Sequence, residues 1–306
     1  RHHCLSHDMK TLLTPSHCEQ VPINGLVYNV RHWGPADAPR LLMLHGWMDS
    51  SASFQFTVDA LRHTWHVLAP DWRGYGQSQW LNRRYWFADY YADLDALLDR
   101  YSPGEPARIV GHSMGGAVAS IYGGARPERI AGLLMVDFLG LLPNEAHEAP
   151  ARIRDWLDHT RATPQLRAYA SREQLAARLV QFNARLLPER ATFLATHCAS
   201  QLPDGRFAVA CDPWHKVPSP HLYRIEEVMA CWRALTAPVL LVTADEGYVM
   251  QRFGKHPGEL QRRMDCFANA SIAHISDCGH NVQHDRPEKL AELIESLPPQ
   301  WQLPET

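Results

Sequence analysis

Residues 109–116, with the sequence IVGHSMGG, constrain the fold of this 306-residue chain more than any other segment. Gly111, Ser113 and Gly115 form a Gly-x-Ser-x-Gly pattern, in which a strand turns sharply into a helix and the serine lies at the turn. A Cβ at either glycine position would clash with the neighbouring strand and helix. The pattern predicts a strained serine whose hydroxyl stands in the open above a helix N-terminus, as a nucleophile requires.

The segments on either side of the pattern support this interpretation. Residues 107–110 are a short apolar run with β-branched side chains, which is typical of a strand. Residues 117–122 have the composition and spacing of a helix, and Pro127 lies just beyond its expected end. The alternative interpretation is a serine in an ordinary strand-to-helix turn, but the order of strand, turn and helix favours the nucleophile.

A second motif lies upstream, where the apolar strand 40–44 runs into His45, Gly46 and Trp47. In serine hydrolases of this architecture, the loop after that strand donates one backbone N–H to the oxyanion hole, and the residue after the nucleophile donates the other. We therefore expect the backbone N–H groups of Trp47 and Met114 to form the oxyanion hole. Gly46 would let the main chain approach the substrate oxygen closely.

A third motif, residues 67–78, is a strand followed by a glycine-rich turn. We expect it to have a structural role, in which Asp71 and Arg73 brace the loops around the pocket. Its glycines do not form a phosphate loop, because no Lys-Ser/Thr pair follows them.

Together these motifs resemble the α/β-hydrolase superfamily over roughly residues 20–300. The matching motifs are His45-Gly46-Trp47, Asp71-x-Arg73-Gly74-x-Gly76-x-Ser78, Gly111-His112-Ser113-Met114-Gly115-Gly116 and Gly279-His280. Residues 45–54 and 136–140 resemble, more narrowly, the serum hydrolase-like group. The resemblance implies an α/β fold with a mostly parallel eight-stranded sheet, helices on both faces and an inserted helical cap.

The predicted base is His280. Residues 270–275 read as the last strand, and residues 287–294 read as an amphipathic helix with proline in its first turn. His280 lies on the loop between them, where this fold places its base. Of the chain's other histidines, we expect His112 to be a packing residue and His284 to lie at the surface or behind the site.

Two carboxylates compete as the acid of the triad, which follows the serine and precedes the histidine in this fold. The usual place is the loop after strand 238–244, where Asp245 arrives early and the expected position holds Gly247. The other place is the end of strand 132–136, where Asp137 faces the edge of the sheet at which ligands bind. We favour Asp137, and Asp245 remains the alternative. Either would accept the Nδ1–H of His280 and stabilise its protonated form.

The chain divides into four predicted segments. Residues 1–19 are an N-terminal extension, 20–138 and 235–306 are the two parts of the hydrolase core, and 139–234 are a helical cap. Within the first part, Asn24-Gly25 predicts a hairpin. Aromatic residues of the cap should line an apolar pocket.

Composition limits the function classes. The formal net charge of −3 gives no basic surface for nucleic acid, and no apolar run approaches the roughly 18 residues of a membrane span. Seven scattered cysteines and the absence of an apolar signal region near the start favour reduced thiols and a cytoplasmic location. We expect no metal or cofactor. These features leave the oligomeric state open.

The resulting hypothesis is a serine hydrolase that cleaves a small-to-medium apolar ester, thioester or lactone through an acyl-enzyme on Ser113. Two alternatives remain: a carbon–carbon bond hydrolase with the same triad, and a ligand-binding protein that has the fold without catalysis.

Overall fold

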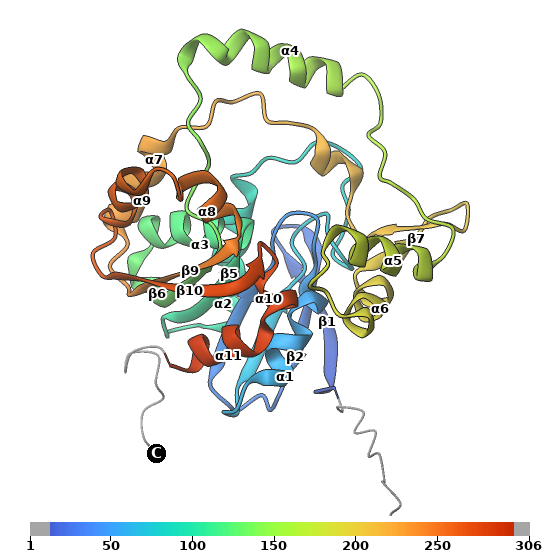
Figure 1. Cartoon of the computed structure of the whole chain (residues 1–306), viewed down its shortest axis with the longest axis horizontal. Helices are drawn as coiled ribbons and strands as arrows, with labels where there is room; N and C mark the ends of the chain where they lie inside the picture. Colours follow the sequence, from blue (N-terminus) through green and yellow to red (C-terminus); the bar gives the residue numbers. More distant parts are fainter. Residues whose placement is uncertain (1–12, 297–306) are drawn as a thin grey trace, which may run out of the picture.

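An eight-stranded sheet runs through residues 13–296, which are the residues that the computed structural model describes (Figure 1). Its strand order is β1-β2-β4-β3-β5-β6-β9-β10. Only β2 runs antiparallel to its neighbours, so the prediction of a mostly parallel eight-stranded sheet is confirmed. The strands are β1 (Ser16–Ile23), β2 (Leu26–Trp33), β3 (Arg40–Leu44), β4 (His66–Pro70), β5 (Ala107–His112), β6 (Ile130–Val136), β9 (Val239–Glu246) and β10 (Ala270–Gly279).

Helices cover both faces of this sheet, and each face has its own cluster of buried apolar residues. One cluster includes residues of α2, α3 and α7, and the other includes residues of η1, α1 and α11. The helices that flank the sheet are η1 (Ser51–Phe54), α1 (Gln55–Ala60), α2 (Asp89–Tyr101), α3 (Met114–Ala125), η2 (Pro127–Arg129), α7 (Ile225–Ala234), α8 (Tyr248–Phe253), α9 (Pro257–Met264), α10 (Val282–Asp285) and α11 (Pro287–Glu295).

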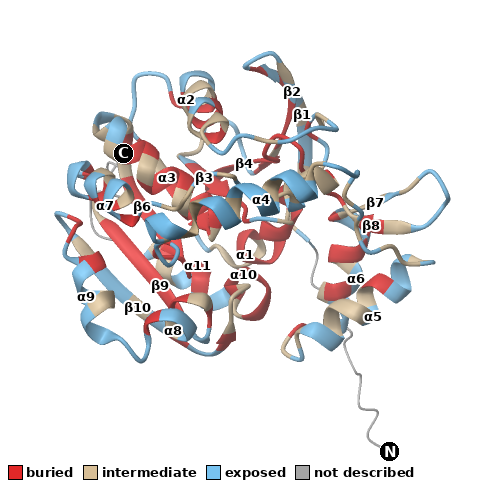
Figure 2. Cartoon of the chain, turned by 90° about the horizontal axis from the view of Figure 1, so that it is seen from above, coloured by how far each residue is buried: buried red, intermediate tan, exposed pale blue. Residues whose placement is uncertain are grey.

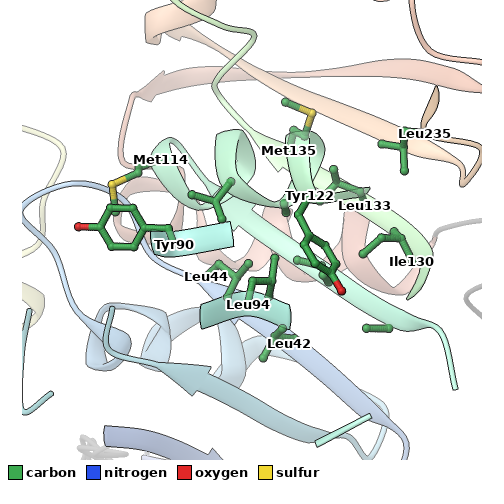
Figure 3. Packing of buried hydrophobic residues seen from close by; sticks show 14 of the residues in the cluster. Leu42, Leu44, Tyr90, Leu94, Met114, Tyr122, Ile130, Leu133, Met135 and Leu235 are labelled. Atoms are coloured by element: carbon green, nitrogen blue, oxygen red, sulfur yellow. The ribbon is translucent and has the colours of Figure 1, made fainter. Parts of the chain in front are cut away.

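The helix α2 illustrates why these segments fold as they do. Its buried residues Tyr90, Leu94, Leu97 and Leu98 recur at helical spacing, so they form one apolar face. Figure 3 shows Leu94 pointing into the packed layer that also contains Tyr122 of α3.

The segment between β6 and β9 forms an insertion with two unlike parts. The helix α4 contains no buried residue, and in Figure 1 it stands away from the sheet. The second part packs on the core, since Leu186 and Leu194 join one buried cluster with Ala52 and Phe56. The elements of the insertion before α7 are η3 (Ala146–Glu148), α4 (Ala149–His159), α5 (Arg172–Phe182), α6 (Pro188–His197), β7 (Ala199–Gln201), β8 (Phe207–Val209) and η4 (Pro213–Lys216).

Two boundaries differ from those expected. The strand β1 begins at Ser16, inside the segment 1–19 that the sequence suggests is an extension; residues 1–12 lie outside the described residues. The helix α7 falls within the expected cap, 139–234, but it packs against α3 on the sheet. Its Trp232 is buried and donates a hydrogen bond to the Ser120 hydroxyl. Burial of the sheet between its covering helices is visible in Figure 2.

Candidate functional site

Ser113 lies between the end of β5 and the start of α3 with φ 51° and ψ −114°. A non-glycine residue in such a conformation costs about 1–3 kcal/mol, which the surrounding packing must offset. The packing requires both glycines of the pattern. A Cβ on Gly111 would lie 2.5 Å from the amide nitrogen of Gly116, and a Cβ on Gly115 would lie 2.2 Å from the carbonyl oxygen of Leu44. Ser113 itself is half-buried.

Asp137 and His280 meet beside this turn. Asp137 directly follows β6 and is fully buried, and His280 directly follows β10. The Nδ1 atom of His280 lies 2.7 Å from Oδ2 of Asp137. The backbone N–H groups of Tyr248 and Val249 also donate to the carboxylate, at 2.6 and 3.2 Å. Three N–H donors therefore compensate the desolvation of this buried carboxylate.

Gly247 makes room for the Asp137 carboxylate. A Cβ at position 247 would lie 2.5 Å from both carboxylate oxygens of Asp137. Position 247 is where the usual spacing would place the acid. The carboxylate of Asp137 thus reaches from the end of β6 into the space beside the loop that follows β9.

Asp245 makes a different pair. Its Oδ1 lies 2.7 Å from Nε2 of His274, and its Oδ2 accepts the backbone N–H of Asp277 at 2.7 Å. These contacts lower the pKa of Asp245, the N–H of Asp277 contributing most. The structure therefore brings His280 to Asp137 and not to Asp245.

Two other histidines have fixed surroundings. The Nε2–H of His112 donates to the carbonyl oxygen of His280 at 2.9 Å, so this buried ring helps to fix the backbone of His280. Burial places the pKa of His112 well below its usual value, and the nearby His280 lowers it further. His284 is buried and hydrogen-bonded to Ser53, so it lies behind the site rather than at the surface.

The loop after β3 lies against the turn of Ser113. A Cβ on Gly46 would be 3.2 Å from the Cβ of Ser113, and Met114, the residue after Ser113, begins α3. The N–H groups of Trp47 and Met114, the two expected oxyanion donors, therefore belong to segments that adjoin this serine. The Trp47 side chain is 55% exposed, and its indole N–H donates to the carbonyl oxygen of His215 in the insertion at 3.3 Å.

His45 fixes the peptide unit that contains the Trp47 N–H, a role that the sequence does not reveal. The backbone N–H of Trp72 donates to Nε2 of His45 at 3.0 Å, so the ring proton lies on Nδ1. That proton is donated to the carbonyl oxygen of Gly46 at 2.7 Å. Burial lowers the pKa of His45, which keeps this ring neutral. In a trans peptide the C=O and N–H point in opposite directions, so the Trp47 N–H points away from His45.

Asp71 and Arg73 brace the surrounding loops as the third motif suggests. Asp71 is buried and accepts the backbone N–H of Ser51 at 2.7 Å, just beyond the loop of Trp47. Arg73 donates two hydrogen bonds to the buried Asp93, at 2.6 and 2.7 Å.

Within residues 13–296, no group of three or more histidine, cysteine or carboxylate side chains could hold a metal ion. Over the same residues, no helix is long and apolar enough to cross a membrane.

Comparisons with known proteins agree with this fold. The family model described as alpha/beta hydrolase fold matches residues 39–287. The chain is 26% identical over 276 residues to a serine hydrolase-like protein of Danio rerio, covering 86% of this chain and 82% of the relative. It is 28% identical over 277 residues to the lipase LipV of Mycobacterium tuberculosis, covering 88% of this chain and 96% of the relative. A solved thioesterase domain from the curacin biosynthetic pathway superposes with a TM-score of 0.80 at 24% identity, covering 92% of this chain and 100% of the domain.

Proposed function

Because the chain belongs to the α/β hydrolase fold family, and its relatives include serine hydrolase-like proteins, we propose that it is a serine hydrolase with Ser113 as nucleophile. The observation that supports this most is the 2.7 Å contact between Asp137 and His280, beside a serine held in a strained turn. The proposed substrate is a small-to-medium apolar ester, thioester or lactone. The name of the relative LipV, a lipase, favours an ester.

In the proposed mechanism the Ser113 oxygen attacks the substrate carbonyl carbon, and its proton passes to Nε2 of His280. The Nδ1–H of His280 is donated to Asp137, so Nε2 of the neutral ring has the lone pair that accepts this proton. The buried carboxylate fixes that tautomer and stabilises the imidazolium ion that forms.

The carbonyl oxygen becomes an oxyanion, which the N–H groups of Trp47 and Met114 are proposed to bind. Each such donor contributes about 3 kcal/mol to transition-state stabilisation. The tetrahedral intermediate then collapses, and the leaving group takes the proton from His280. Water attacks the acyl-enzyme with His280 again as base, which releases the acid and restores the Ser113 hydroxyl.

The acid in this proposal is Asp137. Its carboxylate is fully buried and accepts a hydrogen bond from His280. The carboxylate also lies where a Cβ at position 247 would stand, which the glycine leaves free. Asp245 is paired with His274 and is half exposed, which argues against it.

The insertion is proposed to act as a cap, because it contacts the loops around Ser113 from two sides. The Trp47 indole reaches His215, and Asn183 reaches Asp285 beside the loop of His280. Substrate would enter between these contacts. Two aromatic side chains of the insertion, Trp156 and Phe182, lie under the guanidinium groups of Arg84 and Arg178.

The test is hydrolysis of p-nitrophenyl esters from acetate to decanoate by the wild type and by Ser113→Ala. We expect turnover by the wild type, highest on one part of the series, and at least a 10³-fold lower kcat for Ser113→Ala. An active Ser113→Ala variant would contradict the assignment of the nucleophile. A wild type that cleaves none of the esters would contradict the substrate class.

A further inference from the structure

A short turn of the insertion reaches the loops that hold Asp137 and His280. The turn joins α5 to α6 and includes Asn183 and Arg185. The Asn183 amide donates to Oδ1 of Asp285 at 2.6 Å. Arg185 donates to Glu246 at 2.8 and 3.2 Å and to Asp277 at 3.0 Å. The turn thus contacts both the end of β9 and the segment around His280.

Asp285 connects Asn183 to the residue before His280. Its second oxygen, Oδ2, accepts the backbone N–H of Gly279 at 2.8 Å. Asp285 is 5% exposed, so this carboxylate cannot exchange its protein donors for water without structural change. The chain of contacts is therefore Asn183 to Asp285 to Gly279, and Gly279 is covalently joined to His280. We call these three residues the base brace.

The outer end of the base brace is itself fixed. Leu186, three residues after Asn183, is 4% exposed and packs in the buried cluster with Ala52 and Phe56 of the core. The Asn183 side-chain oxygen also accepts the backbone N–H of Arg185 at 3.2 Å, which sets the direction of its amide group. Because Leu186 anchors the turn, Asn183 can hold Asp285 in place.

We propose that Asn183 is a positioning residue for His280, acting through Asp285 and Gly279. This inference rests on the proposed role of His280 as base. Proton transfer requires Nε2 of His280 at hydrogen-bond distance from the serine oxygen, and a displacement of about 1 Å can cost up to 10²-fold in rate. The base is in position only while the α5–α6 part of the insertion is docked on the core.

Arg185 is expected to have a smaller effect on His280 than Asn183. Its partners Glu246 and Asp277 are 66% and 69% exposed, and exposed ion pairs contribute little to stability in water. The contact between Asn183 and the buried Asp285 is the stronger one, since its acceptor is shielded from solvent.

The test reverses the polarity of this contact. Asn183→Asp places two carboxylates against each other, which breaks the brace. In the double variant Asn183→Asp, Asp285→Asn, the new amide at position 285 accepts from Gly279 through its oxygen and donates through its nitrogen to the new carboxylate at position 183. Both hydrogen bonds of the brace are thereby restored. Asn183→Ala removes the contact without adding charge, in case Asn183→Asp does not fold.

The matched control is Glu288→Gln. Glu288 pairs with Arg190 of α6 at 2.8 Å, so this variant breaks another contact between the insertion and the core. The contact is 62% exposed at Glu288 and does not touch the loop of His280. A purely structural role of Asn183 would lower the thermal unfolding midpoint of Asn183→Ala but leave the kcat of its folded fraction equal to that of Glu288→Gln.

The readout is kcat and KM on the best ester of the series. We expect Asn183→Ala to lower kcat about 10-fold or more with KM changed less than about 3-fold. Asn183→Asp should lose at least as much, the double variant should recover most of it, and Glu288→Gln should match the wild type. An unchanged kcat in Asn183→Ala, or a folded double variant that recovers nothing, would overturn the proposal.

A second readout separates this inference from the proposed function. The proton between His280 Nδ1 and Asp137 should give a low-field resonance in the proton NMR spectrum, whether or not any ester is cleaved. We expect this resonance to broaden through solvent exchange in Asn183→Ala and to return in the double variant. If the wild type cleaves no ester, the proposed function fails, and an unchanged resonance in Asn183→Ala would overturn the positioning role as well.

Discussion

Two aspartates near the C-terminal ends of the neighbouring strands β6 and β9 each bind a histidine at the same distance. Asp137 and His280 are 2.7 Å apart, and so are Asp245 and His274. Their surroundings differ, because the Asp137 side chain is 0% exposed and the Asp245 side chain is 48% exposed. Distance alone therefore does not identify the pair that can serve in catalysis.

The second difference lies in the histidines. Among the described residues, hydrogen bonds occupy both ring nitrogens of His274, through Asp245 and Thr243, but only Nδ1 of His280. A base needs one ring nitrogen with an available lone pair. The burial of the aspartate, together with the histidine nitrogen that makes no hydrogen bond, therefore distinguishes the proposed catalytic pair from the pair of Asp245 and His274.

The largest effect should come from removing the acid of each pair in turn. Asp137→Asn leaves the shape of the side chain but disfavours the His280 tautomer that accepts the serine proton, so kcat should fall about 10³–10⁴-fold. Asp245→Asn should change kcat less than about 3-fold, because Asp245 contacts His274 instead. The measurement is kcat on the best ester. A larger loss of kcat in Asp245→Asn than in Asp137→Asn would show that Asp245 is the acid.

The next prediction concerns His45, the buried histidine that binds the Gly46 carbonyl oxygen beside the proposed oxyanion donor Trp47. His45→Leu removes the Nδ1–H that holds the Gly46 carbonyl, so the Trp47 N–H loses its orientation and kcat should fall about 10²-fold. His45→Asn keeps an N–H donor at the same position of the side chain and should retain more activity. Both variants lose the acceptor for the Trp72 N–H, so their difference isolates the contact with Gly46. Equal kcat values for the two would contradict this role.

A third experiment disturbs the buried pair without touching either member. Gly247→Ala adds a Cβ that would lie 2.5 Å from both Asp137 oxygens, which forces the carboxylate to move. We expect kcat to fall about 10-fold or more, by the same sensitivity to small displacements. The control is Gly258→Ala, where a Cβ meets nothing within 4 Å. Similar activities of the two variants would show that Asp137 needs no such space.

The smallest expected effect is on the pH dependence of stability, through the exposed pair of Asp245 and His274. The Asp277 N–H and His274 lower the pKa of Asp245, so the unfolded state binds this proton first as the pH falls. The stabilisation by Asp245 is therefore present above the ordinary carboxyl pKa near 4 and is lost as the pH falls through the lowered value. Asp245→Asn should slightly flatten the dependence of the urea midpoint on pH below the ordinary carboxyl pKa near 4. Salt should weaken the difference, because the pair is exposed.

The sequence predicts the sheet and the turn of Ser113 because local patterns determine them. The run of β-branched residues before Gly111 and the two glycines around Ser113 encode a strand, a close approach and a helix. The position of His280 follows from the order of the last strand and helix. For the same reason, the sequence favours Asp137, the carboxylate that the structure places against His280.

Contacts between segments far apart in the chain cannot be predicted from local sequence patterns. Asn183 and Asp285 are separated by 102 positions, and no local pattern marks either of them. The role of the His45 ring could not be predicted for the same reason, since its partner Trp72 lies on the loop after a different strand. The extent of the predicted cap differs from the structure because the amphipathic helix α7 packs on α3, and its sequence alone does not indicate which surface it covers.

Ser113 is the proposed nucleophile, and covalent labelling is the most direct measurement of its reactivity. The protein would be treated with a fluorophosphonate, and the modified peptide would be mapped by mass spectrometry in the wild type, Ser113→Ala and Asp245→Asn. We expect one adduct on Ser113 in the wild type and in Asp245→Asn, and none in Ser113→Ala. An unlabelled wild type, or a label on any other residue, would contradict it.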